Sequence, residues 1–446
     1  MFKKIKNKVL DAASDETTRN VFLTVAVRIL AAVFGLAMQV LLARTMELGE
    51  YGIYVILWTW ICVINQLGVV GFTDSSMRYV PKYVKRNKTT HLNGFYSTGF
   101  FTVLSGSFVL VLIGLALLTG MGDWLEEGFY FPCLLVLVGI PLLALESYLN
   151  GVSRGLGWYM FSTIPAFIVR PFLIMLAVSL AYLGGYTVDA SFVFSIILVI
   201  TACVIAFQAV YIRSKIADPA AKSANSRQRK FWIWSSVSLL PAMMADEIFV
   251  WCDVLLLGFF ATPEQTSVYF AAQRSLSLAA FVQFAFMLVA ARNFSITNTS
   301  ADKVELQRQI TRSTNATFLL TIPSVLLTLI AGYPLLFLFG PDFLNAYPAM
   351  IILGFAYILR SLTGQAPDLL VILGKHKIHL IISAASIVLC IIGMWILVPM
   401  VGINGAAATM AMVYALRAVA YTILTQRETG YWVLASPRFT AKIVTA

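Results

Sequence analysis

Long apolar runs alternate with short polar segments along the whole chain. A membrane-spanning helix needs about 20 mostly apolar residues, and the pattern predicts twelve such helices. We expect these spans at 21–43, 53–73, 94–119, 129–150, 161–182, 190–212, 232–258, 266–290, 315–339, 346–373, 378–400 and 402–425. The first run is too long for the apolar core of a signal peptide, so we interpret it as an uncleaved span. The pattern therefore predicts an all-α polytopic membrane protein with twelve transmembrane helices.

A polar stretch near the midpoint, "RSKIADPAAKSANSRQRK", divides the predicted spans into two sets of six. Two short segments, LLARTMELGEYGIY (41–54) and LLGFFATPEQTSVY (256–269), align with a shift of 215 residues. A repeat near half the chain length favours two six-helix lobes around a central cavity. The predicted organisation is a cytoplasmic N-terminal segment (1–20), an N-lobe (21–212), a cytoplasmic linker (213–231), a C-lobe (232–425) and a cytoplasmic C-terminal tail (426–446).

The composition excludes a set of soluble domains. Of the 446 residues, 59% are hydrophobic and 12% are charged, whereas soluble domains are about 25% charged. The five cysteines stand singly and there are only three histidines, so we expect neither a disulfide framework nor a metal site. There is no Walker A loop and no GxGxxG turn after a strand. We therefore expect no nucleotide site and no cofactor.

Basic residues are concentrated on one side of the predicted topology. The two termini and the loops on their side hold 26 of the 32 Lys and Arg residues, and the opposite loops hold only Arg44. Cytoplasmic loops of membrane proteins carry such an excess, so we expect both termini to lie in the cytoplasm. The net charge of +11 then follows from topology and does not predict a nucleic-acid partner.

Eight charged residues lie deep within predicted spans, where an ionisable group costs at least about 2.5 kcal/mol unless it faces a cavity or a partner. The arginines are Arg28, Arg170, Arg274, Arg360 and Arg417, and the acids are Asp246, Glu247 and Asp253. Asp246 and Asp253 are seven residues apart and share one face of the seventh predicted span. Glu247 points about 100° away from Asp246.

Two interpretations of the three acids remain open. They pair with Arg28, Arg274 or Arg360 and lock helices together, or they line a polar cavity that holds substrate or a coupling cation. Three further acids, Asp74, Glu146 and Asp368, lie at cytoplasmic ends of predicted spans, where solvation would explain them. The span arginines outnumber the span acids by two, and arginine is well shaped for bidentate phosphate binding. The excess therefore favours an anionic substrate.

Three segments carry a resemblance to a known family: LLARTMELGEYGIYVILWTWICVINQLGVVGFTDSSMRYVPKY (41–83), CDVLLLGFFATPEQTSVYFAAQRS (252–275) and VPMVGINGAAATMAMVYALR (398–417). The first resembles the opening of bacterial polysaccharide flippases, the second the Asp-led start of their second half, and the third their GxxGAA entry to the last span. These flippases belong to the multidrug/oligosaccharidyl-lipid/polysaccharide exporter superfamily. One departure is Thr266-Ser267, where the second half more often has Val-Gly.

The resemblance implies two lobes, a central cavity and alternating access. It also implies a substrate, an undecaprenyl-diphosphate-linked oligosaccharide that is turned from the inner to the outer leaflet of the bacterial inner membrane, as in O-antigen and lipopolysaccharide synthesis. The five span arginines would then form the cationic lining that meets the diphosphate. Polysaccharide polymerase and ligase machinery are candidate protein partners, and a proton or sodium ion is a candidate coupling ion that the three acids would carry.

Three alternatives to a flippase would each require other features. An ion-coupled multidrug exporter of the same superfamily would use Asp246 and Glu247 as ligands for cationic drugs. A transporter of another fold would carry a Gly/Asp/Arg-rich signature after its second span, where this chain reads "GFTDSSMRYVPKYVKRNK". A membrane-embedded glycosyltransferase would carry a large outside loop, and no predicted outside loop here is long enough to build a catalytic site. We therefore expect a transporter and not an enzyme.

Overall fold

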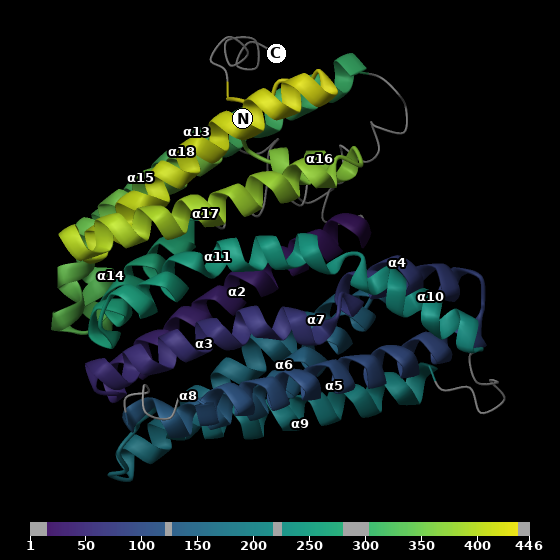
Figure 1. Ribbon diagram of the computed structural model, residues 1–446, viewed down its shortest axis with the longest axis horizontal. Coiled ribbons are helices and arrows are strands. Elements are labelled where there is room, and N and C mark those ends of the chain that lie inside the picture. The colour runs from purple at the N-terminus through teal and green to yellow at the C-terminus, as the bar shows by residue number, and fades with distance from the viewer. Residues whose placement is uncertain (1–15, 121–126, 217–224, 280–302, 436–446) are drawn as a thin grey trace, which may run out of the picture.

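The computed structural model describes residues 16–120, 127–216, 225–279 and 303–435, and every regular element in these ranges is helical (Figure 1). The first group comprises α2 (Glu16–Thr45), α3 (Leu48–Val69), α4 (Phe72–Lys85), α5 (Thr89–Gly120), α6 (Glu127–Gly155), α7 (Tyr159–Ile164), a π-helix (Pro165–Val169), α8 (Arg170–Leu183) and α9 (Ala190–Ile216). The second group comprises α10 (Ser226–Val237), α11 (Leu240–Phe260), a helix over 263–279, α13 (Lys303–Ile330), α14 (Gly332–Phe339), a 3-10 helix (Pro341–Ala346), α15 (Tyr347–Ser361), α16 (Ala366–Ile372), α17 (His376–Val401) and α18 (Ile403–Thr429).

Two lobes are visible in Figure 1 and confirm the predicted fold class. The N-lobe (α2 to α9) lies below, and the C-lobe (α11 to α18) lies above. The helix α11 lies between them because it packs against α3 of the N-lobe and against α17 of the C-lobe. The helix α10, in contrast, packs against α4 and α5 of the N-lobe, so the chain crosses between the lobes where α10 passes into α11.

Ten helices in the described part are long and apolar enough to cross a membrane, and they correspond to ten of the twelve predicted spans. The predicted span 232–258 is not one continuous helix, because a break at Ser238 and Leu239 separates α10 from α11. The predicted span 266–290 begins within the helix over 263–279, and its last part, 280–290, lies outside the described residues.

Proline and glycine interrupt other predicted spans. The span expected at 161–182 contains a π-helical turn that begins at Pro165, and the span expected at 346–373 is broken between α15 and α16. Within that break Gly364 has a φ of +51°, a left-handed conformation that glycine adopts without steric cost. Pro367 follows in the first turn of α16. This break shapes the cavity described below.

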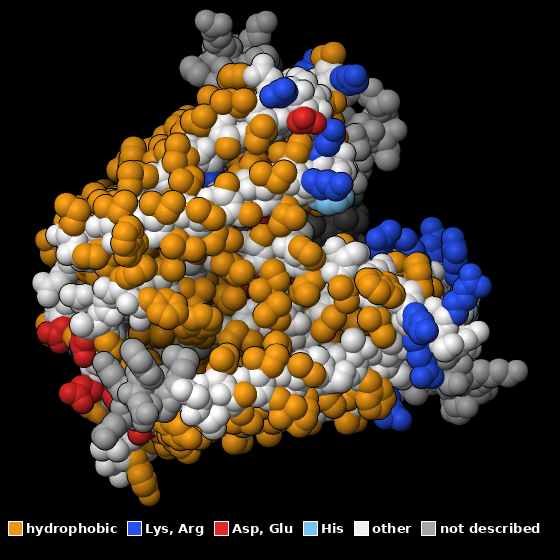
Figure 2. Space-filling view, viewed as in Figure 1, with side chains coloured by type: hydrophobic (Ala, Val, Ile, Leu, Met, Phe, Trp, Pro, Cys, Tyr) orange, Lys and Arg blue, Asp and Glu red, His pale blue; other side chains and the backbone are white. Residues whose placement is uncertain are grey.

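Charges separate toward opposite ends of the molecule (Figure 2). Acidic side chains gather at the end where α2 passes into α3 and where α14 lies, and we call this the acidic end. Lysine and arginine gather at the opposite end, near α4 and α10, and we call this the basic end. The space-filling view is hollowed between the two lobes at the basic end.

The lobes meet at the acidic end. Arg44 of α2 donates hydrogen bonds to the carbonyls of Leu338 (2.8 Å) and Phe337 (2.5 Å) at the end of α14. Gly52 of α3 lies directly against the backbone carbonyl of Pro263, where the next C-lobe helix begins. The lobes are thus in contact at the acidic end.

We expect the substitution Gly52→Ala to lower the free energy of unfolding by about 1 to 3 kcal/mol, because the added Cβ atom would meet the Pro263 carbonyl and force α3 away from the C-lobe. The matched control is Gly35→Ala in α2, where an added Cβ has nothing within 4 Å and alanine improves helix propensity. Thermal unfolding of the purified protein in detergent measures both. Equal unfolding temperatures for the two variants would contradict the packing argument.

Candidate functional site

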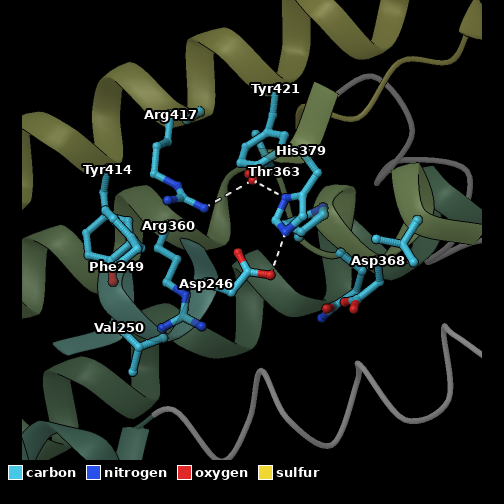
Figure 3. Close-up of a pocket in the computed structure, with 15 residues that line it drawn as sticks. Asp246, Phe249, Val250, Arg360, Thr363, Asp368, His379, Tyr414, Arg417 and Tyr421 are labelled. Carbon is cyan, nitrogen blue, oxygen red and sulfur yellow. Dashed lines mark hydrogen bonds and ion pairs between the residues drawn. The ribbon is translucent and has the colours of Figure 1, made fainter. Parts of the chain in front are cut away.

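A cavity of about 450 Å³ lies within the C-lobe. Its walls come from α11, from the break between α15 and α16, and from α17 and α18 (Figure 3). The break contributes Thr363 and Gly364, and because the chain turns there, α16 brings Asp368 to the same cavity. Polar groups from six segments of the C-lobe, including Arg360 of α15, therefore face one space.

A chain of hydrogen bonds crosses this cavity (Figure 3). Asp246 of α11 bonds through Oδ2 to Nε2 of His379 in α17 at 2.8 Å, and its Oδ1 accepts from the hydroxyl of Ser383 at 3.1 Å. His379 bonds through Nδ1 to the hydroxyl of Tyr421 in α18 at 2.8 Å. Arg417 donates to the same hydroxyl at 3.0 Å. A neutral His379 would then accept from Tyr421 and donate to Asp246.

Two arginines line the cavity beside this chain. The guanidinium of Arg417 lies 3.8 Å from the ring centre of Phe249, and its Nη1 is buried with no hydrogen-bond partner among the described residues. The guanidinium of Arg360 lies 5.9 Å from the ring centre of Tyr414. Within the described ranges, neither guanidinium has a carboxylate oxygen within 4.0 Å. Both can therefore offer N–H groups to an anion.

The charges of the cavity balance. Asp368 lines it together with Asp246. Two arginines, Arg360 and Arg417, face two aspartates, Asp246 and Asp368. The formal charge is zero when His379 is neutral, and the cationic excess expected from the sequence is not found in this cavity.

Arg170 lies in the N-lobe and already has a partner. Its Nη1 lies 2.5 Å from a carboxylate oxygen of Glu146, and the two side chains are 13% and 5% exposed. The sequence predicts a solvated Glu146, but α6 continues to Gly155 and Glu146 is only 4% exposed within the lobe. Beside the pair is a smaller cavity of about 140 Å³, which Trp58 also lines. Breaking a buried ion pair leaves an uncompensated charge, so Arg170 is held in place.

The other two predicted arginines lie outside both cavities. The guanidinium of Arg274 lies 5.0 Å from the ring centre of Trp251 and 4.6 Å from that of Phe270. Arg28 is half-buried in α2. Of the five arginines, Arg360 and Arg417 line the larger of these two cavities and Arg170 lines the smaller.

The three acids of α11 face three different neighbours. Asp246 faces α17, as described. Asp253 is 2% exposed and accepts hydrogen bonds from the hydroxyl of Tyr269 at 2.9 Å and the amide of Gln273 at 2.8 Å. Glu247 faces the N-lobe, where it accepts from the amide of Gln66 in α3 at 3.4 Å, and it also accepts from the indole of Trp251 at 2.9 Å.

The partners that the structure gives these acids are therefore a histidine, hydroxyls, amides and an indole rather than arginines. Of the three, Asp246 has a side chain that is 47% exposed. It is the acid best placed to exchange a proton or contact a ligand, whereas Asp253 is fully bonded in the interior.

Sequence reasoning missed His379 and Tyr421. A signal was present, because His379, Ser383 and Ser386 are spaced four and three residues apart and share one face of α17. Similarly, Tyr414, Arg417 and Tyr421 share a face of α18. Such polar stripes within apolar helices mark the faces that line a common space.

No protein-family model matches the chain. The chain is 25% identical over 207 residues to the probable low-salt glycan biosynthesis flippase Agl15 of Haloferax volcanii, and this match covers 46% of the chain and 44% of the relative. The match thus spans less than half of that relative's length.

Two solved structures are similar over most of their length. One is the inward-facing conformation of a multidrug resistance MATE family transporter of the MOP superfamily. Its TM-score is 0.77 at 11% sequence identity, and the alignment covers 93% of this chain and 96% of the transporter chain. The lipid II flippase MurJ, in an inward closed conformation, has a TM-score of 0.71 at 14% identity, with 91% and 87% covered. The chain therefore has the two-lobed helical fold of the MOP superfamily transporters.

Proposed function

We propose that this protein is a flippase that moves a lipid-diphosphate-linked oligosaccharide from the inner to the outer leaflet of the cytoplasmic membrane. The observation that carries the proposal is the pair of guanidinium groups of Arg360 and Arg417, which share one cavity without a carboxylate within 4.0 Å in the described part of the chain. The similarity to a glycan biosynthesis flippase and to a lipid II flippase supports the same activity.

The chemistry of the cavity suits a diphosphate. Arginine presents a planar fork of N–H donors that matches two phosphate oxygens at once. Ligand sites commonly measure about 300 to 1,000 Å³, so a cavity of about 450 Å³ can hold a diphosphate with the adjoining sugar. The hydrocarbon tail would remain in the bilayer. The substrate would cross without any covalent bond being made or broken.

The arrangement of the two lobes suits entry of the substrate from the basic end. Because basic loops face the cytoplasm in membrane proteins, we assign the basic end to the cytoplasm, and both termini with it. The lobes are joined at the acidic end by Arg44 and Gly52 and are hollowed apart at the basic end (Figure 2). A reversal of these contacts would open the site to the other leaflet.

A second candidate is an ion-coupled multidrug exporter. Two observations favour it: the cavity has zero formal charge with two aspartates in it, and the fold matches a multidrug resistance transporter with a TM-score of 0.77. In this case Asp246 would bind a cationic drug and release it in exchange for a proton. The two candidates differ in the sign of the charge that the cavity selects.

We expect Arg360→Gln and Arg417→Gln each to reduce flipping of a lipid-linked oligosaccharide about 10- to 100-fold, because a hydrogen bond to a charged group contributes about 1.5 to 3 kcal/mol. Flipping is measured in vesicles that contain the purified protein. The matched control is Arg427→Gln, an exposed arginine in the last turn of the helix that carries Arg417, which should flip at the wild-type rate.

Two results would contradict the flippase. One is wild-type flipping by both cavity variants. The other is a deletion strain that makes normal surface polysaccharide and accumulates no lipid-linked intermediate. If the deletion strain instead loses tolerance to cationic drugs, and expression of the wild-type protein restores it, the exporter replaces the flippase.

The effect of removing one acid from the cavity separates the two candidates by its sign. The charged side chains that line the cavity are Asp246 of α11, Asp368 of α16, Arg360 of α15 and Arg417 of α18. The variant Asp246→Asn removes one negative charge and leaves a net positive charge. It should therefore bind a diphosphate lipid more tightly than the wild type does, whereas it should bind a cationic drug more weakly.

Both affinities are measured at one pH for the wild type and for Asp246→Asn. The matched control is Asp253→Asn, which lies on the same helix but is bonded to Tyr269 and Gln273. It should lower the unfolding temperature and leave both affinities unchanged. Unchanged affinities in Asp246→Asn would exclude Asp246 from the binding site.

A further inference from the structure

The helices α4 and α10 together form a basic surface at one end of the N-lobe (Figures 1 and 2). The segments 72–93 and 225–237 hold eight Lys and Arg residues and a single acid, Asp74. The basic side chains are Arg78, Lys82, Lys85, Arg86, Lys88, Arg227, Arg229 and Lys230, and each of them is exposed. We call this the α4–α10 surface.

Polar contacts fix α10 against α4. The hydroxyls of Ser75 and Ser236 lie 2.6 Å apart, and the indole of Trp232, which is 1% exposed, donates to the hydroxyl of Tyr83 at 2.7 Å. Gly71 lies directly against the carbonyl of Ser236, so a side chain there would separate the helices. The two helices therefore present their outer faces as one unit.

Apolar side chains lie among the charges on the outer face of α10. On this face, Lys230, Phe231 and Trp234 follow Arg227 by three, four and seven residues, a spacing that places all four on one side of the helix. Phe231 is 56% exposed and Trp234 is 74% exposed. In α4, Arg78, Lys82 and Lys85 form a similar stripe. A face that mixes cations with a large exposed aromatic ring is typical of a helix at a membrane interface.

We propose that the α4–α10 surface is a docking site for anionic phospholipid head groups of the bilayer leaflet at the basic end. The charge excess of seven in these two segments is complementary to lipid phosphates, and juxtamembrane basic clusters attract anionic lipids. Phe231 and Trp234 insert beside the glycerol backbone, which a soluble phosphate ion does not offer. This inference goes beyond the proposed transport and does not depend on its substrate.

Lipid bound here acts on the lobe crossing. The helix α10 is bonded to the N-lobe, and the chain turns at Ser238 and Leu239 into α11, which carries Asp246. Lipid that bridges α4 and α10 would hold α10 on the N-lobe. When the C-lobe moves, α11 would then change its angle to α10 at Ser238 and Leu239.

The test titrates phosphatidylglycerol and phosphatidylcholine separately onto the detergent-solubilised full chain and counts bound lipid by native mass spectrometry. The variant with Arg78, Lys82, Lys85 and Lys230 all changed to Gln should bind phosphatidylglycerol at least about tenfold more weakly. The matched control changes four exposed basic residues of the C-lobe end, Lys303, Arg312, Lys377 and Arg427, to Gln and should bind like the wild type.

A second variant, Phe231→Ser with Trp234→Ser, keeps every charge and should weaken binding of both lipids while the salt dependence is retained. An equal loss of phosphatidylglycerol binding in the C-lobe control would overturn the proposal, since it would show a general effect of net charge. Equal binding of both lipids by the wild type, or displacement by inorganic phosphate at constant ionic strength, would also overturn it. None of these measurements requires flipping, so the proposed function can fail independently.

Discussion

The cost of placing carboxylates in a low-dielectric interior determines how this molecule is assembled. The helix α11 carries three acids, and each one must find donors because an unpaired charge within a membrane is expensive. Asp246 meets His379 of α17, Asp253 meets Tyr269 of the following helix, and Glu247 meets Gln66 of α3. These contacts tie α11 to both lobes, so a helix that looks ill suited to a membrane becomes the element on which the two lobes depend.

Breaks in the helices place these polar side chains around the C-lobe cavity. A continuous helix over 346–373 would keep Asp368 in line with α15, whereas the turn around Gly364 lets α16 present it to the cavity. The break at Ser238 and Leu239 similarly separates α10, which is bonded to the N-lobe, from α11. Because the chain crosses between the lobes at the Ser238–Leu239 break, movement between the lobes is expected there rather than within the long straight helices.

The sequence could predict what depends on run length and composition. The two-lobed helical fold is confirmed, and ten of the twelve spans correspond to helices that can cross a membrane. Local pattern could not predict pairings between distant residues. Glu146 looked solvated because hydropathy ends the span near 150, yet α6 continues and Arg170 covers it. Likewise, the sequence could not predict the partners of His379, because α11 and α18 bring Asp246 and Tyr421 to its two ring nitrogens only in the folded protein.

The charge balance of the cavity also bears on the energy source of the proposed flippase. Two arginines and two aspartates make the empty site formally neutral. The membrane potential would therefore not oppose the conformational change that turns the empty site back to the cytoplasm. A bound diphosphate would add negative charge, and each elementary charge that crosses 100 mV exchanges about 2.3 kcal/mol with the field. With the cell interior negative, outward movement of that charge is favourable. The membrane potential would thus favour export of an anionic substrate and oppose export of a cationic drug.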